Sequence, residues 1–118
     1  MPKKILIIDD EAGIVEEVKL FLEEEGYAVV TADSAKDGIT ALLTERPDLL
    51  ILDMKLPDAS GLEVLKVSKE KCPKTKVIVN TGYVDQKIID EAEELGRDVF
   101  LQKPFNLLAL KEEIDKLI

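Results

Sequence analysis

The chain alternates between short unbroken apolar runs and longer stretches in which apolar residues recur every three or four positions. The clearest run, residues 49–52 (LLIL), ends in Asp53, and residues 4–9 (KILIID) have the same form. An unbroken apolar run is typical of a strand that is covered on both faces, as in a parallel sheet. We expect strands at 4–9, 27–31, 48–53, 76–81 and 99–102.

Five stretches with helical spacing follow these runs. Ser34 with Asp37, and Ser60 with Glu63, resemble capping boxes at the start of a helix. Asn106 is expected to cap the last helix. The helices are expected to begin at about Gly13, after Ser34, after Ser60, at about Asp85 and after Asn106. The expected inner faces include Ile14, Val18, Phe21 and Leu22 in the first helix and Ile39, Leu42 and Leu43 in the second.

This alternation, with short connections, predicts an α/β fold: a doubly wound five-stranded parallel sheet with helices on both faces. At 118 residues the chain is expected to form one domain, 1–118. Right-handed crossovers leave few possible strand orders. The order 2-1-3-4-5 is favoured because strands one and three carry the longest apolar runs and therefore belong near the centre.

Composition excludes several classes of function. The formal charge of −9 argues against direct nucleic-acid binding, which needs clustered Lys and Arg. The absence of histidine excludes histidine acid–base catalysis and zinc–histidine sites. The single cysteine, Cys72, excludes an internal disulfide, and we expect a reducing cytoplasm. No apolar run approaches the roughly 20 residues of a membrane helix, so no membrane association is expected.

Chemistry-bearing residues collect at the strand ends. Asp9 and Asp10 follow strand one, Asp53 follows strand three, Thr81 ends strand four and Lys103 follows strand five. These ends meet at one edge of a parallel sheet, where ligands bind in such folds. Each residue also has a plainer interpretation; Asp10, for example, could cap the first helix. Their joint placement favours a site.

Three clustered carboxylates repel one another, by about 4 kcal/mol for a pair at about 4 Å and an effective dielectric near 20. Lys103 offers one positive charge, and a divalent ion would supply the rest. Oxygen ligands without Cys or His indicate Mg²⁺, with Mn²⁺ possible. A carboxylate, Mg²⁺, a hydroxyl and a lysine together are typical of phosphoryl transfer onto an aspartate.

Four motifs support this interpretation: Ile8-Asp9-Asp10-Glu11, the Asp53-x-x-Leu-Pro-x-x-x-Gly loop, Asn80-Thr81-Gly82 and residues 100–105 (FLQKPF). With them, the whole chain resembles the receiver domain of two-component response regulators, the CheY-like family. The 2-1-3-4-5 strand order is itself known in that family.

The resemblance implies that Asp53 accepts a phosphoryl group from a sensor histidine kinase or a histidine phosphotransfer protein. Asp10 and Asp53 would bind Mg²⁺ through their side chains and Asp9 through water. The backbone carbonyl of Lys55 would be a further ligand, and Lys103 would contact the phosphoryl group. The domain would be a signalling phosphoacceptor rather than an enzyme acting on a separate substrate.

The resemblance also implies a switch. Thr81 would move toward the phosphoryl group, and Phe100 would rotate inward. The surface of helix four, strand five and helix five would then change toward an output domain, a partner protein or a phosphorylation-dependent dimer. The Lys103-Pro104 peptide bond would be cis.

Three residues depart from the family pattern. Phe100 lacks the hydroxyl of the tyrosine in many relatives, and Arg97 stands where a small residue is usual. Tyr83, two residues beyond Thr81, is expected to shield the phosphoryl group from water.

Three other functions are compatible with parts of this pattern. Haloacid-dehalogenase-type phosphatases also use Asp, Mg²⁺, Thr and Lys, but their Asp-x-Asp motif after the first strand is missing here, and their chains are generally longer. The second alternative is a receiver-like module that binds partners without phosphorylation. Neither G-x-G-x-x-G nor a Walker A loop follows any strand, which argues against nucleotide binding.

Overall fold

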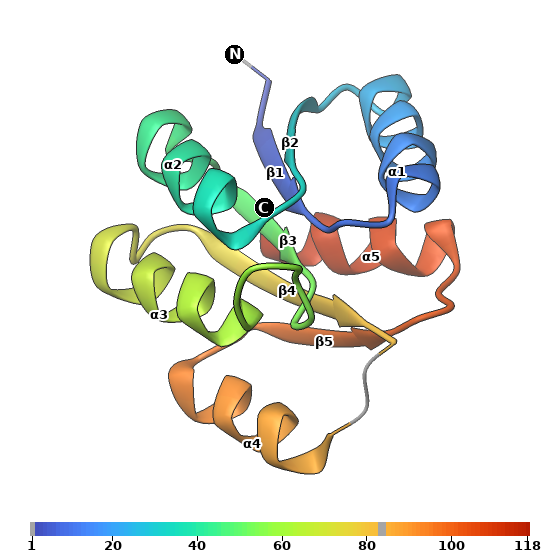
Figure 1. Cartoon of the computed structure of the whole chain (residues 1–118). Helices are drawn as coiled ribbons and strands as arrows, with labels where there is room; N and C mark the ends of the chain where they lie inside the picture. Colours follow the sequence, from blue (N-terminus) through green and yellow to red (C-terminus); the bar gives the residue numbers. More distant parts are fainter. Residues whose placement is uncertain (1, 83–84) are drawn as a thin grey trace.

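Five parallel strands form one sheet in the order β2-β1-β3-β4-β5, which confirms the predicted topology (Figure 1). The computed structural model describes residues 2–82 and 85–118. The strands are β1 (Lys4–Ile8), β2 (Ala28–Ala32), β3 (Leu49–Leu52), β4 (Lys76–Thr81) and β5 (Val99–Gln102). The helices are α1 (Ala12–Glu24), α2 (Ala35–Glu45), α3 (Gly61–Lys71), α4 (Gln86–Leu95) and α5 (Leu107–Leu117).

Strand register brings the strand ends to one edge of the sheet. Ile8, the last residue of β1, is level with Ala32 in β2 and with Leu52 in β3. Leu52 is in turn level with Val79 in β4. The residues that follow these strands therefore leave the sheet side by side, as the parallel arrangement requires.

Two apolar layers cover the sheet because successive side chains in each strand point to opposite faces. Leu6, Ile8, Leu50 and Leu52 face α2, α3 and α4, where Leu42, Val64 and Ala92 complete the layer. Ile5, Ile7, Leu49 and Ile51 face α1 and α5, where Val18, Leu22, Leu110 and Ile114 complete the other. β1 and β3 are buried in both layers, which is why their apolar runs are unbroken.

Local signals set where the helices begin. Ser34 Oγ accepts a hydrogen bond from Asp37 N at 3.1 Å, as the capping prediction requires. Asn106 Oδ1 accepts from the backbone N–H groups of Leu108 and Ala109, so it caps α5 as predicted. Ser60 caps α3, but its Oγ accepts from Leu62 N rather than from Glu63 N.

One predicted core position is wrong. Leu43 is 39% exposed, although the helical spacing predicts it on the inner face of the second helix. The buried positions of α2 are Ala35, Gly38 and Leu42, and Leu43 lies about 100° further round the helix than Leu42. Gly38 belongs to this face because a Cβ there would lie 2.6 Å from Ile8 Cδ1.

Two strands end one residue earlier than predicted, and β2 lies one residue later than its predicted range of 27–31. β1 ends at Ile8 and β3 at Leu52, so Asp9 and Asp53 stand just beyond the sheet.

The single cysteine, Cys72, is buried. Among the described residues, no helix has the length and apolar character needed to cross a membrane.

Candidate functional site

Three carboxylates meet at the carboxyl edge of the sheet. Asp9 and Asp10 follow β1, Asp53 follows β3, and one oxygen from each lies within 4.8 Å of the oxygens of the other two. Asp9 and Asp53 are each only 5% exposed, whereas Asp10 is exposed. The clustering predicted from the strand ends is therefore present.

Lys103 links these acids from the loop after β5. Its Nζ lies 2.7 Å from Asp9 Oδ2, 2.6 Å from Glu11 Oε1 and 3.2 Å from Asp53 Oδ2. The ammonium group has three N–H donors, so these three bonds use all of them. Glu11 was not predicted as a site residue; the signal that could have identified it is a third acid in succession after β1.

Burial and hydrogen bonding shift the pKa values of Asp9 and Lys103 in opposite directions. Burial raises the pKa of Asp9, and the hydrogen bonds from Lys103 and from Glu11 N lower it only in part, so the net pKa is raised. Burial lowers the pKa of Lys103, but the bonds to Asp9 and Glu11 outweigh it and the net pKa is raised. Four carboxylates, on Asp9, Asp10, Glu11 and Asp53, share this edge with the Lys103 ammonium, which favours a further cation.

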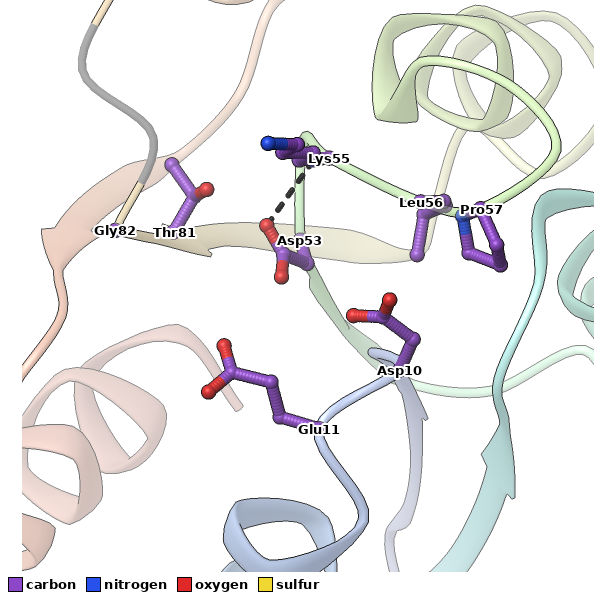
Figure 2. A pocket seen from close by; sticks show the side chains of 8 residues that line it. All are labelled: Asp10, Glu11, Asp53, Lys55, Leu56, Pro57, Thr81 and Gly82. Carbon is purple, nitrogen blue, oxygen red and sulfur yellow. Dashed lines mark hydrogen bonds between the residues drawn. The ribbon is translucent and has the colours of Figure 1, made fainter.

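Asp53 is held from two sides. Lys55 N donates a hydrogen bond to Asp53 Oδ1 at 3.1 Å (Figure 2), while Oδ2 accepts from Lys103 Nζ. One oxygen is therefore tied to the loop after β3 and the other to the loop after β5. These bonds fix the orientation of the Asp53 carboxylate.

An open pocket of about 380 Å³ lies over this carboxylate. Figure 2 shows Asp10 and Glu11 approaching it from the segment after β1, and Thr81 from the end of β4. The pocket is also lined by Lys55, Leu56, Pro57 and Gly82. Thr81 is 1% exposed and lies at the carboxyl end of its strand, where it was predicted.

The donor set fits a hard divalent cation. Carboxylate oxygens are the ligands that Mg²⁺ and Mn²⁺ prefer, and among the described residues no sulfur or imidazole ligand lines this pocket. The plainer interpretation of Asp10 as a helix cap is wrong: the N-cap of α1 is Glu11, and no side chain makes a capping hydrogen bond there. The exposed Asp10 carboxylate instead lines the pocket.

The residues expected to take part in switching lie on β5 and beside it. Phe100 is partly buried against the layer formed with α2, α3 and α4. The guanidinium carbon of Arg97 lies 5.6 Å from the centroid of the Phe100 ring, a cation–π contact that the sequence did not indicate. The Lys103-Pro104 bond is cis, as expected. Tyr83 lies outside the described residues.

Comparison with known proteins identifies this arrangement. A family model described as the response regulator receiver domain matches residues 5–115. The chain belongs to this family. The predicted fold and the receiver function are thereby confirmed.

Relatives of this receiver domain differ in length. The sporulation initiation phosphotransferase F of Bacillus subtilis is 35% identical over 118 residues, which are all of this chain and 95% of that protein. The alkaline phosphatase synthesis transcriptional regulatory protein PhoP of the same organism is 36% identical over 106 residues, but the match spans only 44% of its length.

Solved structures agree with the fold. A CheY-like response regulator receiver domain protein from Methanospirillum hungatei superposes with a TM-score of 0.96 at 35% identity, covering 98% of this chain and 93% of that one. The response regulator TrrA from Thermotoga maritima, solved in complex with Mg²⁺ and BeF, superposes with a TM-score of 0.88 at 36% identity, covering 98% and 99%.

Proposed function

We propose that this receiver domain accepts a phosphoryl group on Asp53 from a sensor histidine kinase or a histidine phosphotransfer protein. The observation that carries the proposal is the state of Asp53: nearly buried, fixed at both oxygens, and open to a pocket on one side. A carboxylate held in one orientation is well placed for in-line attack on phosphorus.

In the transfer step, an oxygen of Asp53 forms a bond to phosphorus. The bond from phosphorus to the donor nitrogen, or to the acyl oxygen of a small donor, breaks, and its electron pair leaves with the donor. The three phosphoryl oxygens need hydrogen-bond donors. Lys103 Nζ lies 3.2 Å from Asp53 Oδ2 and would supply one donor by giving up one of its three bonds to the carboxylates, and the Thr81 hydroxyl is proposed as another.

The metal in this proposal is Mg²⁺, with Mn²⁺ as a substitute. Asp10 and Asp53 would bind it through their side chains, Asp9 through a water molecule and Lys55 through its backbone carbonyl. When bound, the ion would neutralise negative charge on the phosphoryl oxygens. The Mg²⁺ bound in the Thermotoga TrrA structure supports the choice of metal.

The proposed output is a change in the surface formed by α4, β5 and α5. Thr81 would move toward the new phosphoryl group and Phe100 would turn inward, a two-state change biased by a local charge event. The recipient would be an output domain, a partner protein or a second copy in a phosphorylation-dependent dimer. The chain would catalyse only its own phosphorylation and dephosphorylation. A cytoplasmic location stays a prediction from cysteine usage.

Intact mass spectrometry after incubation with acetyl phosphate tests the acceptor. Wild type is expected to gain one phosphoryl group in the presence of Mg²⁺ and none after chelation. Asp53→Asn should gain none, while Asp90→Asn, which changes an exposed acid on α4, should behave as wild type.

The same experiment addresses the phosphorylation-independent binding module. If wild type gains no adduct with acetyl phosphate or with a histidine kinase, that alternative replaces the proposed function. An adduct that survives in Asp53→Asn would move the acceptor to another residue.

A further inference from the structure

The loop between β3 and α3 closes on itself. Lys55 and Ser60 form an antiparallel bridge across it, and Gly61 N donates to Met54 O at 2.7 Å. Residues 54–61 therefore form a small hairpin, which we call the acceptor loop. Asp58 stands near its tip, directly after the pocket-lining residues Lys55, Leu56 and Pro57.

The tip of the acceptor loop is fastened to the start of α2. Asp58 Oδ1 accepts from Ala35 N at 2.7 Å and Asp58 Oδ2 from Lys36 N at 3.0 Å. These bonds join segments more than twenty residues apart in sequence. The backbone N–H groups of Lys36 and Ala35 lower the pKa of Asp58, so the carboxylate is charged at neutral pH.

Asp58 completes a cap that the helix does not provide for itself. The first four N–H groups of an α-helix lack partners within the helix. In α2 these include the N–H groups of Ala35, Lys36 and Asp37. Ser34 Oγ takes the N–H of Asp37, and those of Ala35 and Lys36 go to Asp58. Capping is thus divided between a local residue and the acceptor loop.

The first residues of the acceptor loop hold Asp53, the proposed phosphoacceptor, which directly precedes the loop. Lys55 N is the donor that fixes Asp53 Oδ1, and the Lys55–Ser60 bridge ties Lys55 to the rest of the loop. A displacement of the tip would therefore reach Asp53 through Lys55. The carbonyl proposed as a metal ligand belongs to that same residue.

We propose that Asp58 is a positioning residue for phosphorylation: by fastening the acceptor loop to α2, it fixes Lys55 and so orients Asp53 for the metal and the phosphoryl donor. This inference rests on the proposed function. It assigns the capping contact a role beyond the stability of α2, because the bonds that hold the helix also hold the loop.

Paired variants separate the two roles. Asp58→Ala and Ser34→Ala each remove part of the cap of α2, but only Asp58→Ala releases the acceptor loop. Asp58→Asn keeps one acceptor oxygen and serves as the conservative variant. Thermal unfolding followed by circular dichroism measures the stability of each, and backbone amide NMR during a titration with MgCl₂ measures the affinity for the metal alone.

Asp58→Ala is expected to weaken the apparent Mg²⁺ affinity about 10-fold, the lower end for residues that orient metal ligands from outside. Ser34→Ala should leave it within about 2-fold of wild type, and Asp58→Asn should lie between the two. Incorporation of phosphoryl from acetyl phosphate at fixed, subsaturating Mg²⁺ should follow the same order. The amide resonance of Lys55 should shift in Asp58→Ala even without metal.

Equal effects of Asp58→Ala and Ser34→Ala on Mg²⁺ affinity would assign Asp58 to the helix alone and overturn the inference. Should Asp58→Ala fail to fold, Asp58→Asn decides: an affinity equal to that of wild type overturns the inference, and a reduced affinity at a melting temperature matching that of Ser34→Ala supports it. Absence of Mg²⁺ binding by wild type would instead refute the proposed metal site.

Discussion

Helices α1 and α2 both begin at the carboxyl edge of the sheet, and both begin beside carboxylates. At α2 one acid and one serine serve the helix: the side chains of Asp58 and Ser34 together accept the N–H groups of its first three residues. At α1 no side chain caps the helix from the N-cap position. Asp9 Oδ1 accepts from Glu11 N at 2.9 Å, while Asp9 Oδ2 and Glu11 are bonded to Lys103.

The difference in capping shows that the acids near α1 serve the site, whereas those near α2 serve the fold. A missing N-cap costs a helix roughly 0.5–2 kcal/mol. At α1 the acids are directed toward Lys103 and the pocket, and the helix is held by its buried face, which includes Val18 and Leu22. At α2 the capping is complete, and through Asp58 it also holds the loop that carries the acceptor.

The largest expected effect is that of Gly61→Ala at the end of the acceptor loop. A Cβ at Gly61 would collide with the Asp53 carbonyl oxygen and lie 2.7 Å from Met54 Cα. Gly61→Ala should therefore destabilise the protein by about 3 kcal/mol, the cost of overpacking a site that cannot relax. Chemical unfolding in urea measures it.

Gly13→Ala in α1 is the matched control. A Cβ at Gly13 meets nothing within 4 Å, so alanine should stabilise the helix by roughly 0.5–1 kcal/mol. Similar losses in the two variants would contradict the assignment of the acceptor loop as the constrained segment.

Removing the positive charge of Lys103, which lies beside the start of α1, should have the next largest effect. Lys103→Met leaves Asp9 and Asp53 buried beside each other without the ammonium that both contact. We expect a loss of about 2 kcal/mol, below the 3–5 kcal/mol of a fully buried pair because water reaches this pocket. Urea unfolding with and without Mg²⁺ provides the measurement.

Added Mg²⁺ should restore more stability to Lys103→Met than it adds to wild type, because it replaces the missing charge. Lys76→Met changes an exposed lysine at the opposite end of β4 and should leave stability within about 0.5 kcal/mol of wild type. An unchanged unfolding curve for Lys103→Met would show that the acids do not repel.

Substitutions at the N-caps of α1 and α2 directly test whether only α2 is capped by a side chain. Ser34→Ala should cost about 1 kcal/mol because it removes a bonded cap. Glu11→Ala should cost about 0.5 kcal/mol or less, since Glu11 does not cap α1 and its bond to Lys103 is half-exposed. The reverse order in urea unfolding would mean that Glu11 supports α1.

The smallest effect concerns the far end of α1, where the chain turns into β2. Tyr27 OH donates to Asp115 in α5 at 2.8 Å. Burial, and after it the hydrogen bond to Asp115, raise the pKa of Tyr27 to about 12. The protonated phenol is thus favoured in the folded state, so its contribution is fully present below pH 10 and is lost as pH rises through 12.

Tyr27→Phe should therefore reduce stability by at most about 1 kcal/mol near neutral pH. The difference from wild type should shrink between pH 10 and 12, as followed by urea unfolding across that range. A difference that stays constant through pH 12 would exclude the hydrogen bond as its cause.

The sequence by itself favoured the observed order of the strands and identified three of the acids that meet at their ends. Unbroken apolar runs such as residues 49–52 indicate buried strands. The parallel register of these strands then brings Asp9, Asp10 and Asp53 to one edge. Helix faces were less certain from sequence: spacing alone allowed Leu43 inside, but the close packing of Gly38 on Ile8 sets the face of α2 and leaves Leu43 exposed.

Only the tertiary structure decided which acid serves which purpose. Asp10 and Asp58 both lie beside helix starts, and local pattern treats such residues alike as possible caps. Asp10 lines the pocket, whereas Asp58 caps a helix more than twenty residues away in sequence. A hydrogen bond between distant segments depends on where the loops meet in space, and neither propensity nor periodicity within a segment contains that information.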